Sequence, residues 1–465
     1  MRLKARCSAF YFMLKSLIKS LLPKPLLFFY HKTLAVLANV FYGFPSRKMV
    51  VIGVTGTKGK SSTVVMITRI LEEAGLKVGS TNTVFFKINN KEWPNTTKQG
   101  MLGRFKLQKL LRQMVRAGCT HAVIEVTSEG IAQSRQWGIA FDVAVFTNLS
   151  PEHIESHGSY EKYREAKASI FKHLAGSYHK DRPLTLAPRV KVGALKKTIV
   201  VNRQDVEADY FLKFKADEKW EVCDSCKDCQ SNGNEKTLCA DSFNLTPEAI
   251  GFTVQGQLIH LPLPGQFMMT NALLAMAAAM SLDISLTTCK EALEKINLIP
   301  GRLEFVEAGQ DFKVIVDYAH EPRSFAAILS TGRELAQDHK LIVVFGVTGG
   351  GRDTAKRPIM GELATKQADY IILTTDDPYD DDPKSLITDI VPGIKGNKWV
   401  ENQNWWQVVD RRQAINQALS MARSGDVVLL LGKGSEQIMA VAGGKTIAWN
   451  DREVAKELLM SKSKI

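Results

Sequence analysis

Met49-Val-Val-Ile-Gly-Val-Thr-Gly-Thr-Lys-Gly-Lys-Ser-Ser-Thr63 is the stretch that decides the fold. Its β-branched run up to Gly53 predicts a buried strand, its glycines predict a turn, and Ser61 predicts the start of a helix. Backbone N–H groups in such a turn, with a helix N-terminus behind them, form a cradle for phosphate groups. Lys60 can reach the β- and γ-phosphates, and the Ser61 hydroxyl can ligate Mg²⁺. The stretch therefore predicts a nucleotide site. It departs from the strict P-loop pattern, because five residues separate Gly53 from Gly59 where that pattern has four.

The same alternation of strand and helix continues along the chain. Runs of β-branched residues predict strands at 49–53, 121–126, 143–147, 341–346, 370–375 and 427–431. Amphipathic stretches predict helices at 61–74, 106–117 and 159–174. This rhythm is typical of parallel sheets in α/β proteins.

The boundaries of these units follow from breaks in the pattern. Ile299-Pro300-Gly301 interrupts the alternation and marks a boundary. We expect a central domain with a parallel sheet at 48–299 and a second α/β domain at 300–465. The polar, cysteine-bearing stretch 203–260 is expected to form a β-rich insertion in the central domain.

Residues 1–47 are basic and apolar, and they predict a helical N-terminal segment. Phe10, Leu14, Leu17 and Leu21 recur at helical spacing. The segment lacks about 20 uninterrupted apolar residues, so a spanning helix is not expected. Its lysines and the lack of a cleavage site argue against a signal peptide. Two interpretations stay open: helices packed on the body of the protein, or an interfacial helix on an anionic membrane.

The net charge of the chain limits the classes of partner that it is expected to bind. The 465 residues include 61 Lys and Arg against 48 Asp and Glu, a net charge of +13. Such an excess attracts nucleotides, nucleic acid or anionic membrane, or it is general surface charge. No nucleic-acid recognition module is evident, so no nucleic-acid partner is expected.

Seven cysteines with uneven spacing favour a reducing, cytoplasmic compartment. Four of them, at 223, 226, 229 and 239, lie close together in the sequence. These four supply either the thiolates of a Zn²⁺ site or free thiols in a loop: Cys223, Cys226, Cys229 and Cys239.

Further blocks extend the first one and give the chain a family resemblance. They are Ile124-Glu-Val-Thr-Ser-Glu-Gly130, Phe146-Thr-Asn-Leu-Ser-Pro-Glu-His-Ile-Glu-Ser-His-Gly158, Tyr163-Arg-Glu-Ala-Lys167, Asp317-Tyr-Ala-His-Glu-Pro322 and Gly432-Lys-Gly-Ser-Glu436. In this order the blocks resemble the Mur ligases, over about 48–465, and specifically their MurE-like branch. The resemblance implies a P-loop-type central ATPase domain followed by a Rossmann-like C-terminal domain.

The resemblance also implies an activity and its cofactors. These ligases use ATP and Mg²⁺ to convert a carboxylate into an acyl phosphate, which the amine of an amino acid then attacks. The MurE-like branch adds the third residue of the peptidoglycan stem peptide to a muramoyl-peptide precursor. An ATP-dependent acid–amino-acid ligase of cell-wall synthesis is therefore expected.

Residue roles carried over from the family divide into groups. Catalysis falls to Lys60, Glu125, His153, Lys167 and Arg302. The metal ligands would be Ser61, Glu125, His153 and Lys167, the last carbamylated in the family. ATP would be bound by Gly56, Thr57, Lys58, Gly59, Lys60, Ser61, Ser62, Asn148, Asn271, Arg302 and Asp317. The substrates would be bound by Thr96, Thr97, Ser128, Arg135, Asp376, Asp377, Gly432 and Glu436.

Several departures from the family pattern bear on the substrates. The usual T-T-P reads Thr96-Thr-Lys98, and the D-N-P-R of diaminopimelate enzymes reads Asp376-Asp-Pro-Tyr379. Tyr379 removes the arginine that grips a distal carboxylate, so diaminopimelate is disfavoured. The acidic residues at 380–382 either favour a cationic amino acid such as lysine or form a solvated loop.

The front of the chain leaves the carrier of the acceptor open. Only 52 residues precede Gly53, where the family usually has a domain for the UDP group. The acceptor is then either UDP-linked or lipid-linked, and a lipid-linked acceptor would suit an enzyme peripheral to the inner membrane face. Two other activities remain as alternatives: a ligase similar to folylpolyglutamate synthase, and a MurT-like ligase or partner subunit.

Overall fold

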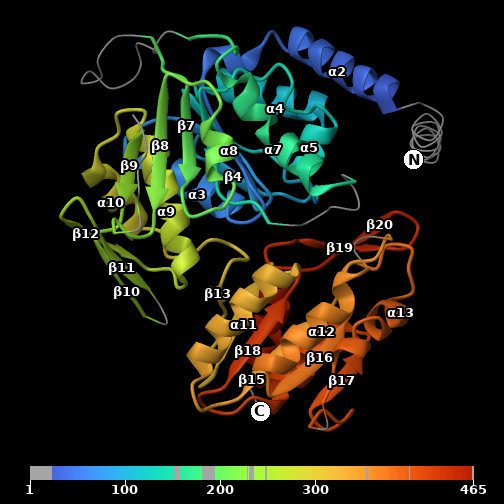
Figure 1. Ribbon diagram of the computed structural model, residues 1–465. Coiled ribbons are helices and arrows are strands. Elements are labelled where there is room, and N and C mark those ends of the chain that lie inside the picture. Colours follow the sequence, from blue (N-terminus) through green and yellow to red (C-terminus); the bar gives the residue numbers. More distant parts are fainter. Residues whose placement is uncertain are drawn as a thin grey trace.

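The computed structural model describes residues 24–150, 158–180, 194–227, 229, 235–246, 249–351, 354–396 and 398–462. They form two α/β parts, one above the other in Figure 1, each built on its own large sheet. The upper part contains residues 50–294 and the lower part residues 304–462. Each β-branched run that predicts a strand lies in one of these two sheets.

The upper sheet has nine strands in the order β4-β3-β2-β5-β1-β6-β7-β8-β9. Neighbouring strands from β2 through β5, β1, β6, β7 and β8 to β9 run parallel. At the other edge, β3 pairs with β2 and β4 pairs with β3, both antiparallel. The strands are β1 (Val50–Thr55), β2 (Val78–Thr81), β3 (Phe85–Ile88), β4 (Lys91–Pro94), β5 (His121–Glu125), β6 (Val143–Phe146), β7 (Thr198–Asn202), β8 (Glu218–Cys223) and β9 (Lys236–Cys239).

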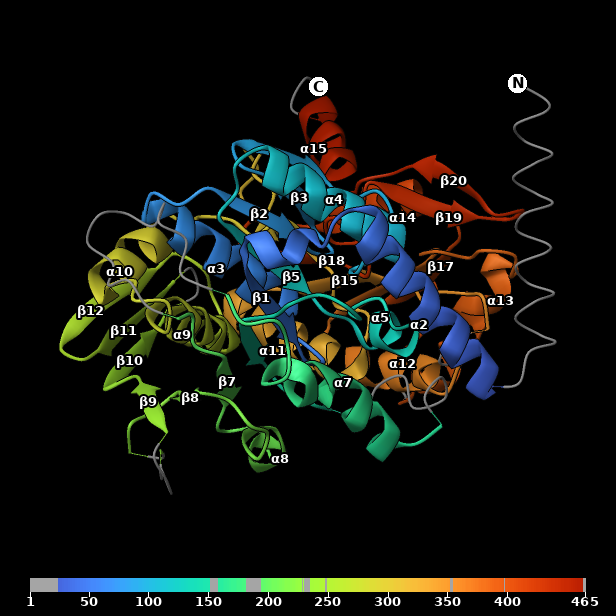
Figure 2. The same ribbon diagram turned by 90° about the horizontal axis from the view of Figure 1, so that it is seen from above.

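Helices cover both faces of this sheet, which explains why its central strands are apolar throughout. Val50, Ile52 and Val54 of β1 face the core under α3, α9 and α10, while Met49 and Val51 face the core under α4 and α7. Figure 2 shows the two groups of helices on opposite sides of β1. The helices of this part are α3 (Lys60–Glu73), α4 (Arg104–Arg116), α5 (Ser128–Ala132), α7 (Tyr160–Leu174), α8 (Ala208–Leu212), α9 (Gln266–Met280) and α10 (Leu286–Glu294).

The stretch 203–260 is rich in strands, as its composition predicts, but half of it continues the main sheet. β8 pairs with β7, and β9 pairs with β8, both in parallel. A separate antiparallel sheet of three strands follows and packs near α10: β10 (Ser242–Leu245), β11 (Ile250–Val254) and β12 (Gln257–Leu261).

The four clustered cysteines form two disulfides, Cys223–Cys229 and Cys226–Cys239. Cys223 and Cys239 are also neighbours across β8 and β9, which brings both pairs together. This pairing corrects the two alternatives drawn from the sequence. A disulfide sulfur carries no thiolate charge, so the four residues are neither free thiols nor zinc ligands.

The lower sheet has six strands in the order β13-β14-β18-β15-β16-β17, parallel except for the β13–β14 pair. Its strands are β13 (Glu304–Phe305), β14 (Lys313–Asp317), β15 (Leu341–Phe345), β16 (Tyr370–Thr374), β17 (Trp405–Val408) and β18 (Val427–Leu431). One face packs on α11 (Pro322–Ala336), α12 (Lys356–Gln367) and α13 (Pro383–Thr388). The other face packs on α14 (Arg411–Met421) and α15 (Asp451–Lys462).

A hairpin and two short 3₁₀ turns complete the described elements. They are β19 (Ile438–Val441), β20 (Lys445–Ala448), η1 (Pro45–Lys48) and η2 (Val391–Gly393).

The N-terminal helix α2 (Lys24–Phe41) lies along the upper part and contacts α4. His31, Ala35, Ala38 and Asn39 are buried against the body. The helix confirms the expected helical character for residues 24–41, and the stripe predicted from Phe10 to Leu21 lies outside the described residues. Among the described helices, none combines the length and the hydropathy that crossing a bilayer requires.

Candidate functional site

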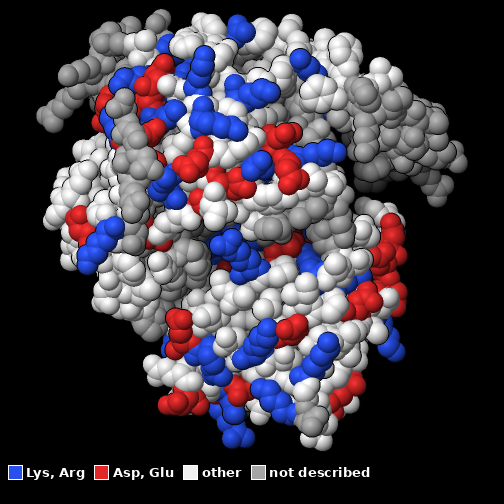
Figure 3. Space-filling view, in the orientation of Figure 1, with Lys and Arg blue, Asp and Glu red and all other residues white. Residues whose placement is uncertain are grey.

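A cleft of about 560 Å³ lies between the two parts of the molecule. Its upper wall is the edge where the parallel strands β1, β5 and β6 end, which is where open α/β sheets bind their ligands. Its lower wall comes from Arg302, from 317–320 at the end of β14 and from the first two turns of α11. In the space-filling view, basic and acidic side chains are mixed over this face and over the waist between the two parts (Figure 3).

The phosphate loop lies between β1 and α3, as the sequence predicts. Gly56 has a φ of 147°, and a Cβ there would lie 2.0 Å from Thr147 Oγ1. Gly59 has a φ of 79°, and a Cβ there would lie 2.3 Å from Asn271 Oδ1. Glycine is therefore required at both positions, by conformation and by space. The loop is held as a preformed cradle at the N-terminus of α3.

Ser61 and Glu125 meet at the floor of this cradle. Ser61 Oγ donates to Glu125 Oε2 at 2.9 Å, and the same oxygen accepts from Thr83 N at 2.8 Å. Glu125 is only 2% exposed, and among the described residues no basic side chain forms an ion pair with it. A buried carboxylate without a basic partner calls for a cation. A hydroxyl beside a carboxylate suits Mg²⁺, so the two residues fit the metal.

The side chains of Lys60 and Lys167 both bind backbone carbonyls of the phosphate loop. Lys60 Nζ donates to Thr57 O at 2.7 Å, within its own loop. Lys167, on α7, donates from Nζ to Gly56 O at 2.6 Å and lies over the Tyr163 ring. Lys167 is 2% exposed, which is unusual for lysine and places it inside the site rather than on the helix surface. His153 lies outside the described residues.

The residues expected around ATP converge on the cleft. Asn148 Oδ1 accepts from Lys58 N at 2.9 Å and so holds the phosphate loop. Asn271 lies under Gly59 and accepts from Thr63 Oγ1 at 3.3 Å. Across the cleft, the guanidinium of Arg302 stacks on the Tyr318 ring, 4.7 Å from its centre.

Asp317 faces the phosphate loop from the C-terminal sheet. Its carboxylate accepts from Leu303 N at 2.9 Å and from Ala319 N at 2.7 Å. Burial raises the pKa of Asp317. Burial also lowers the pKa of the nearby His320, further depressed by Lys58 and Lys356. His320 is therefore a neutral lining group.

The residues expected to bind the acceptor are only partly brought together. Ser128 and Arg135 line the cleft. Arg135 donates to Met101 O, and burial lowers its pKa. Thr97 turns back to Asn95 Oδ1 at 2.7 Å, and neither it nor the exposed Thr96 is among the lining residues. The two threonines therefore shape the loop that carries Lys98.

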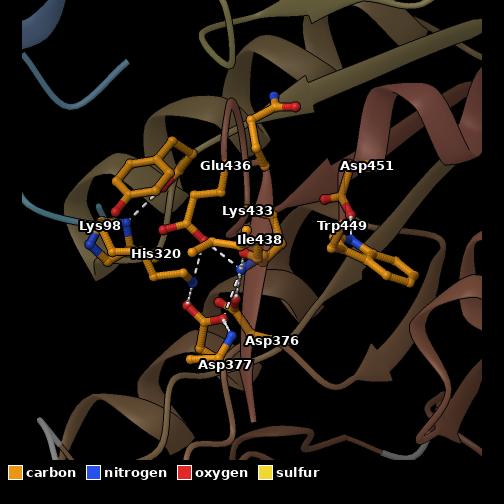
Figure 4. A network of polar contacts seen from close by, with 12 residues as sticks. Lys98, His320, Asp376, Asp377, Lys433, Glu436, Ile438, Trp449 and Asp451 are labelled. Atoms are coloured by element: carbon orange, nitrogen blue, oxygen red, sulfur yellow. Dashed lines mark hydrogen bonds and ion pairs between the residues drawn. The ribbon is translucent and has the colours of Figure 1, made fainter. Parts of the chain in front are cut away.

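The residues expected to bind the amino acid gather in one network at the ends of β16 and β18 (Figure 4). Asp376 and Asp377 follow β16, and Glu436 follows β18. Lys433 Nζ donates to Asp377 Oδ1 at 2.8 Å, to Ile438 O at 3.0 Å and to Glu436. Gly432, with a φ of 107°, leaves room for Asp376, whose Oδ2 would lie 2.8 Å from a Cβ there.

Some residues of the site carry no assigned role in the sequence. Thr83 binds Glu125 from the loop after β2, and nothing in its surroundings in the sequence signals this contact. Lys433 lies inside a recognisable block but receives no role from it. Lys98 marks a departure from the family pattern, and only the fold reveals that it crosses to the other part of the molecule.

Comparison with known families gives two matches along this chain. A model described as the Mur ligase middle domain matches residues 54–279. A model described as the Mur ligase, glutamate ligase domain matches residues 301–434.

Curated proteins show the same likeness over most of the chain. The UDP-N-acetylmuramoyl-L-alanyl-D-glutamate–2,6-diaminopimelate ligase of Bacillus licheniformis is 36% identical over 435 residues, which cover 92% of this chain and 82% of that protein. The UDP-N-acetylmuramyl-tripeptide synthetase of a Roseiflexus species is 36% identical over 432 residues, covering 92% and 81%.

Solved structures share the architecture. A structure of a UDP-N-acetylmuramoyl-L-alanyl-D-glutamate–2,6-diaminopimelate ligase has a TM-score of 0.55 at 26% identity and covers 89% of this chain and 79% of its own. Folylpolyglutamate synthase of Mycobacterium tuberculosis, complexed with ADP and AMPPCP, has a TM-score of 0.62 at 17% identity, covering 86% and 92%. At that identity the second likeness concerns the fold alone.

Proposed function

The chain belongs to the Mur ligase family, and on this premise we propose that it adds an amino acid to a muramoyl-peptide precursor of peptidoglycan. It is an ATP-dependent amide ligase, as its family is. The observation that carries the proposal is the cleft, where a phosphate cradle with Ser61 and Glu125 faces Arg302, Asp317 and His320 on the other wall. Phosphate and amino acid would thus meet between the two walls.

The reaction consists of two transfers. A carboxylate oxygen of the acceptor attacks the γ-phosphorus of ATP, and ADP leaves. The amine of the amino acid then attacks the carbonyl carbon of the acyl phosphate. Phosphate leaves with the former carboxylate oxygen and takes up the proton that the amine gives up.

The main difficulty of these steps is negative charge, because a carboxylate must approach a triphosphate. The N–H groups of 56–62 and the ammonium of Lys60 would bind the phosphates. Arg302 would reach the phosphates from the other wall. Bound Mg²⁺, held by Ser61 and Glu125, would neutralise part of the phosphate charge.

We propose that Lys167 is carbamylated, as the family resemblance implies, and that with His153 it holds a second Mg²⁺. Its burial next to Gly56 O supports this proposal, because a buried amine can lose its proton and add carbon dioxide. The product is a carbamate with one negative charge, which suits a hard cation. A ¹³C NMR signal from labelled carbon dioxide should appear in the wild type and be absent from Lys167→Arg; a signal of equal size in both proteins would refute the assignment.

The remaining substrate roles are proposals on the same basis. We place the acceptor peptide near Ser128 and Arg135, and the amino acid near Asp376, Asp377 and Glu436. The names of the relatives point to a UDP-linked acceptor and, in several cases, to 2,6-diaminopimelate. Tyr379 in place of the expected arginine favours a different amino acid here. A MurT-like reaction on a lipid-linked precursor is the second candidate.

We also propose that the two ligase domains extend over 48–299 and 300–465, after the N-terminal segment 1–47. The separate sheets support this division, because no strand of one sheet pairs with a strand of the other within the described residues.

The N-terminal segment is proposed to hold this enzyme, which uses ATP in the cytoplasm, at the inner face of an anionic membrane. Helix α2 exposes a stripe of large apolar side chains: Leu26, Phe29, Val36, Leu37, Val40 and Phe41. No acidic residue precedes Glu72 in the sequence, while nine lysines and arginines lie within the first 48 residues. An apolar stripe in basic surroundings suits anionic lipid.

Sedimentation with phosphatidylglycerol vesicles tests this membrane proposal. The wild type should sediment with the vesicles, and a variant with Phe29→Glu and Val40→Glu should stay in solution. Val206→Glu changes a valine outside α2 that is even more exposed than Phe29 and Val40, and it serves as control. Equal sedimentation of the double variant and the control would refute the role of α2.

A panel assay tests the main proposal. Phosphate release is measured with ATP, Mg²⁺, UDP-linked or lipid-linked muramoyl dipeptide, and single amino acids. Release that requires acceptor and amino acid together supports a ligase, and the carrier that works distinguishes the two candidates. Release with folate and glutamate instead, or no release with any pair, would overturn the proposal.

A further inference from the structure

Lys98 connects the two parts of the molecule. It follows Thr97 in the loop of the central part, and its Nζ donates to Glu436 Oε2 at 3.0 Å and to Asp377, both in the C-terminal part. Lys98 lines the cleft, whereas Asp376, Asp377 and Glu436 are not among its lining residues. Lys98 thus belongs to the cleft lining and also contacts the carboxylate network through its ammonium group, as the dashed lines of Figure 4 show.

The charges behind Lys98 do not cancel. Asp376, Asp377 and Glu436 lie close enough together to share a cation. Lys433, with a fully buried side chain, supplies one positive charge to the three carboxylates. Arg411 lies near them but is paired with Asp451 through two hydrogen bonds of 2.6 and 2.8 Å. When all three carboxyl groups are ionised, the cluster holds an excess of two negative charges without Lys98 and of one with Lys98.

Of the three carboxylates, Asp376 has the fewest contacts that compensate its burial. It is 3% exposed, no described residue donates a hydrogen bond to its side chain, and its nearest ammonium, that of Lys433, is 3.7 Å away. Burying such a group without a close partner is costly. The carboxylate of Asp376 can therefore accept a further hydrogen-bond donor or cation.

The two lysines differ in how firmly they are held. All three N–H donors of Lys433 are used, by Asp377, Glu436 and Ile438. Lys98 reaches the cluster from the other part of the molecule on a long flexible stem, and its side chain is 14% exposed. Its φ of 53° lies in the left-handed region, which the proline usual at this position in the family cannot adopt. Lys98 is thus the exchangeable cation.

We propose that Lys98 is a specificity residue that stands in for the cationic side chain of the incoming amino acid. In the substrate-free enzyme its ammonium neutralises Asp377 and Glu436. An amino acid with an ammonium group on its side chain displaces Lys98 and takes over these contacts, while an uncharged amino acid cannot. This inference rests on the proposed amino-acid site and adds a competing group to it.

Calorimetric titration of the full chain with L-lysine and L-norleucine tests the inference. Norleucine has the lysine side chain length without the ammonium group. Removing the competitor in Lys98→Met should tighten lysine binding by roughly fivefold to tenfold, the worth of one ion pair. Norleucine binding should stay weak and change less than about twofold.

Two further variants keep the test decisive. Lys98→Arg retains the charge and should bind lysine like the wild type. Lys106→Met, an exposed lysine on α4, controls for general loss of charge. If Lys98→Met is too unstable to titrate, Lys98→Gln is measured with the same expectation.

The outcomes separate this inference from the proposed function, because binding is measured without acceptor or turnover. Lysine binding that weakens or stays unchanged in Lys98→Met and Lys98→Gln would overturn the role of Lys98, even in an active ligase. Tighter lysine binding in those variants supports it, even if no acceptor of the panel is turned over.

Discussion

Glu125 shows how closely a single residue could be anticipated from the sequence. Its place at the end of a β-branched run predicts a carboxylate at the carboxyl edge of the sheet, and the structure places it 2.9 Å from Ser61 Oγ. Its support by Thr83 could not be predicted, because Thr83 follows a different strand and carries no motif. Lys98 is a stronger example, since its partners lie 279 and 338 residues away along the chain.

Replacing Glu125 with Gln should lower kcat by roughly a hundredfold or more, because the amide keeps the shape but loses the charge that holds Mg²⁺. The variant should also need more Mg²⁺ for half-maximal phosphate release. Its thermal stability without nucleotide should not fall, because the change removes a buried negative charge that has no basic partner among the described residues and keeps an oxygen that can accept from Ser61 or Thr83. Glu362→Gln, on the exposed face of α12, is the control, and equal activity of the two variants would contradict the metal role.

Two ion pairs between α14 and α15 differ mainly in burial. Arg411 and Asp451 are almost fully buried, whereas Arg412 and Glu457 are exposed. Asp451→Ala should lower the free energy of unfolding by about 3–5 kcal/mol, because it leaves a buried guanidinium without its partner. Glu457→Ala should cost less than about 1 kcal/mol. Urea unfolding measures both, and similar losses for the two variants would refute the burial argument.

At the scale of elements, strands whose residues are apolar along their whole length are predicted well from composition. Six interior strands, β1, β5, β6, β15, β16 and β18, are buried on both faces and rich in apolar and β-branched residues, so their composition predicted them. The interior strands β2, β7 and β14 were not predicted. Strands β8 and β9 were assigned to an insertion because their polar and cysteine residues lack the apolar pattern of the main sheet. In the structure β8 pairs with β7, and β9 pairs with β8. The disulfides escaped prediction because pairing depends on the register that brings Cys223 beside Cys239.

Alkylation with mass spectrometry tests the disulfides. Protein unfolded without reductant should gain four fewer alkyl groups than protein unfolded after reduction, because two disulfides protect four thiols. Replacing Cys223 and Cys229 together with Ala should reduce that difference to two. The same number of alkyl groups with and without reductant would show that the cysteines are not paired.

At the scale of the whole molecule, function depends on how the two sheets face each other. The sequence predicts both sheets, but each is stabilised by its own helices, and no local pattern fixes their relative position. The cleft, the approach of Arg302 and the contact of Lys98 with Glu436 all follow from that position. The net charge of +13 is not concentrated in one patch on the face seen in Figure 3, where basic side chains are mixed with acidic ones.

The central claim is that an acceptor carboxylate is activated as an acyl phosphate in this cleft. It is tested most directly by labelling both oxygens of that carboxylate with ¹⁸O and analysing the released phosphate by mass spectrometry. The account predicts one labelled oxygen in each phosphate, since the bridging oxygen of the acyl phosphate leaves with it. Unlabelled phosphate from a reaction that forms the amide would contradict the account.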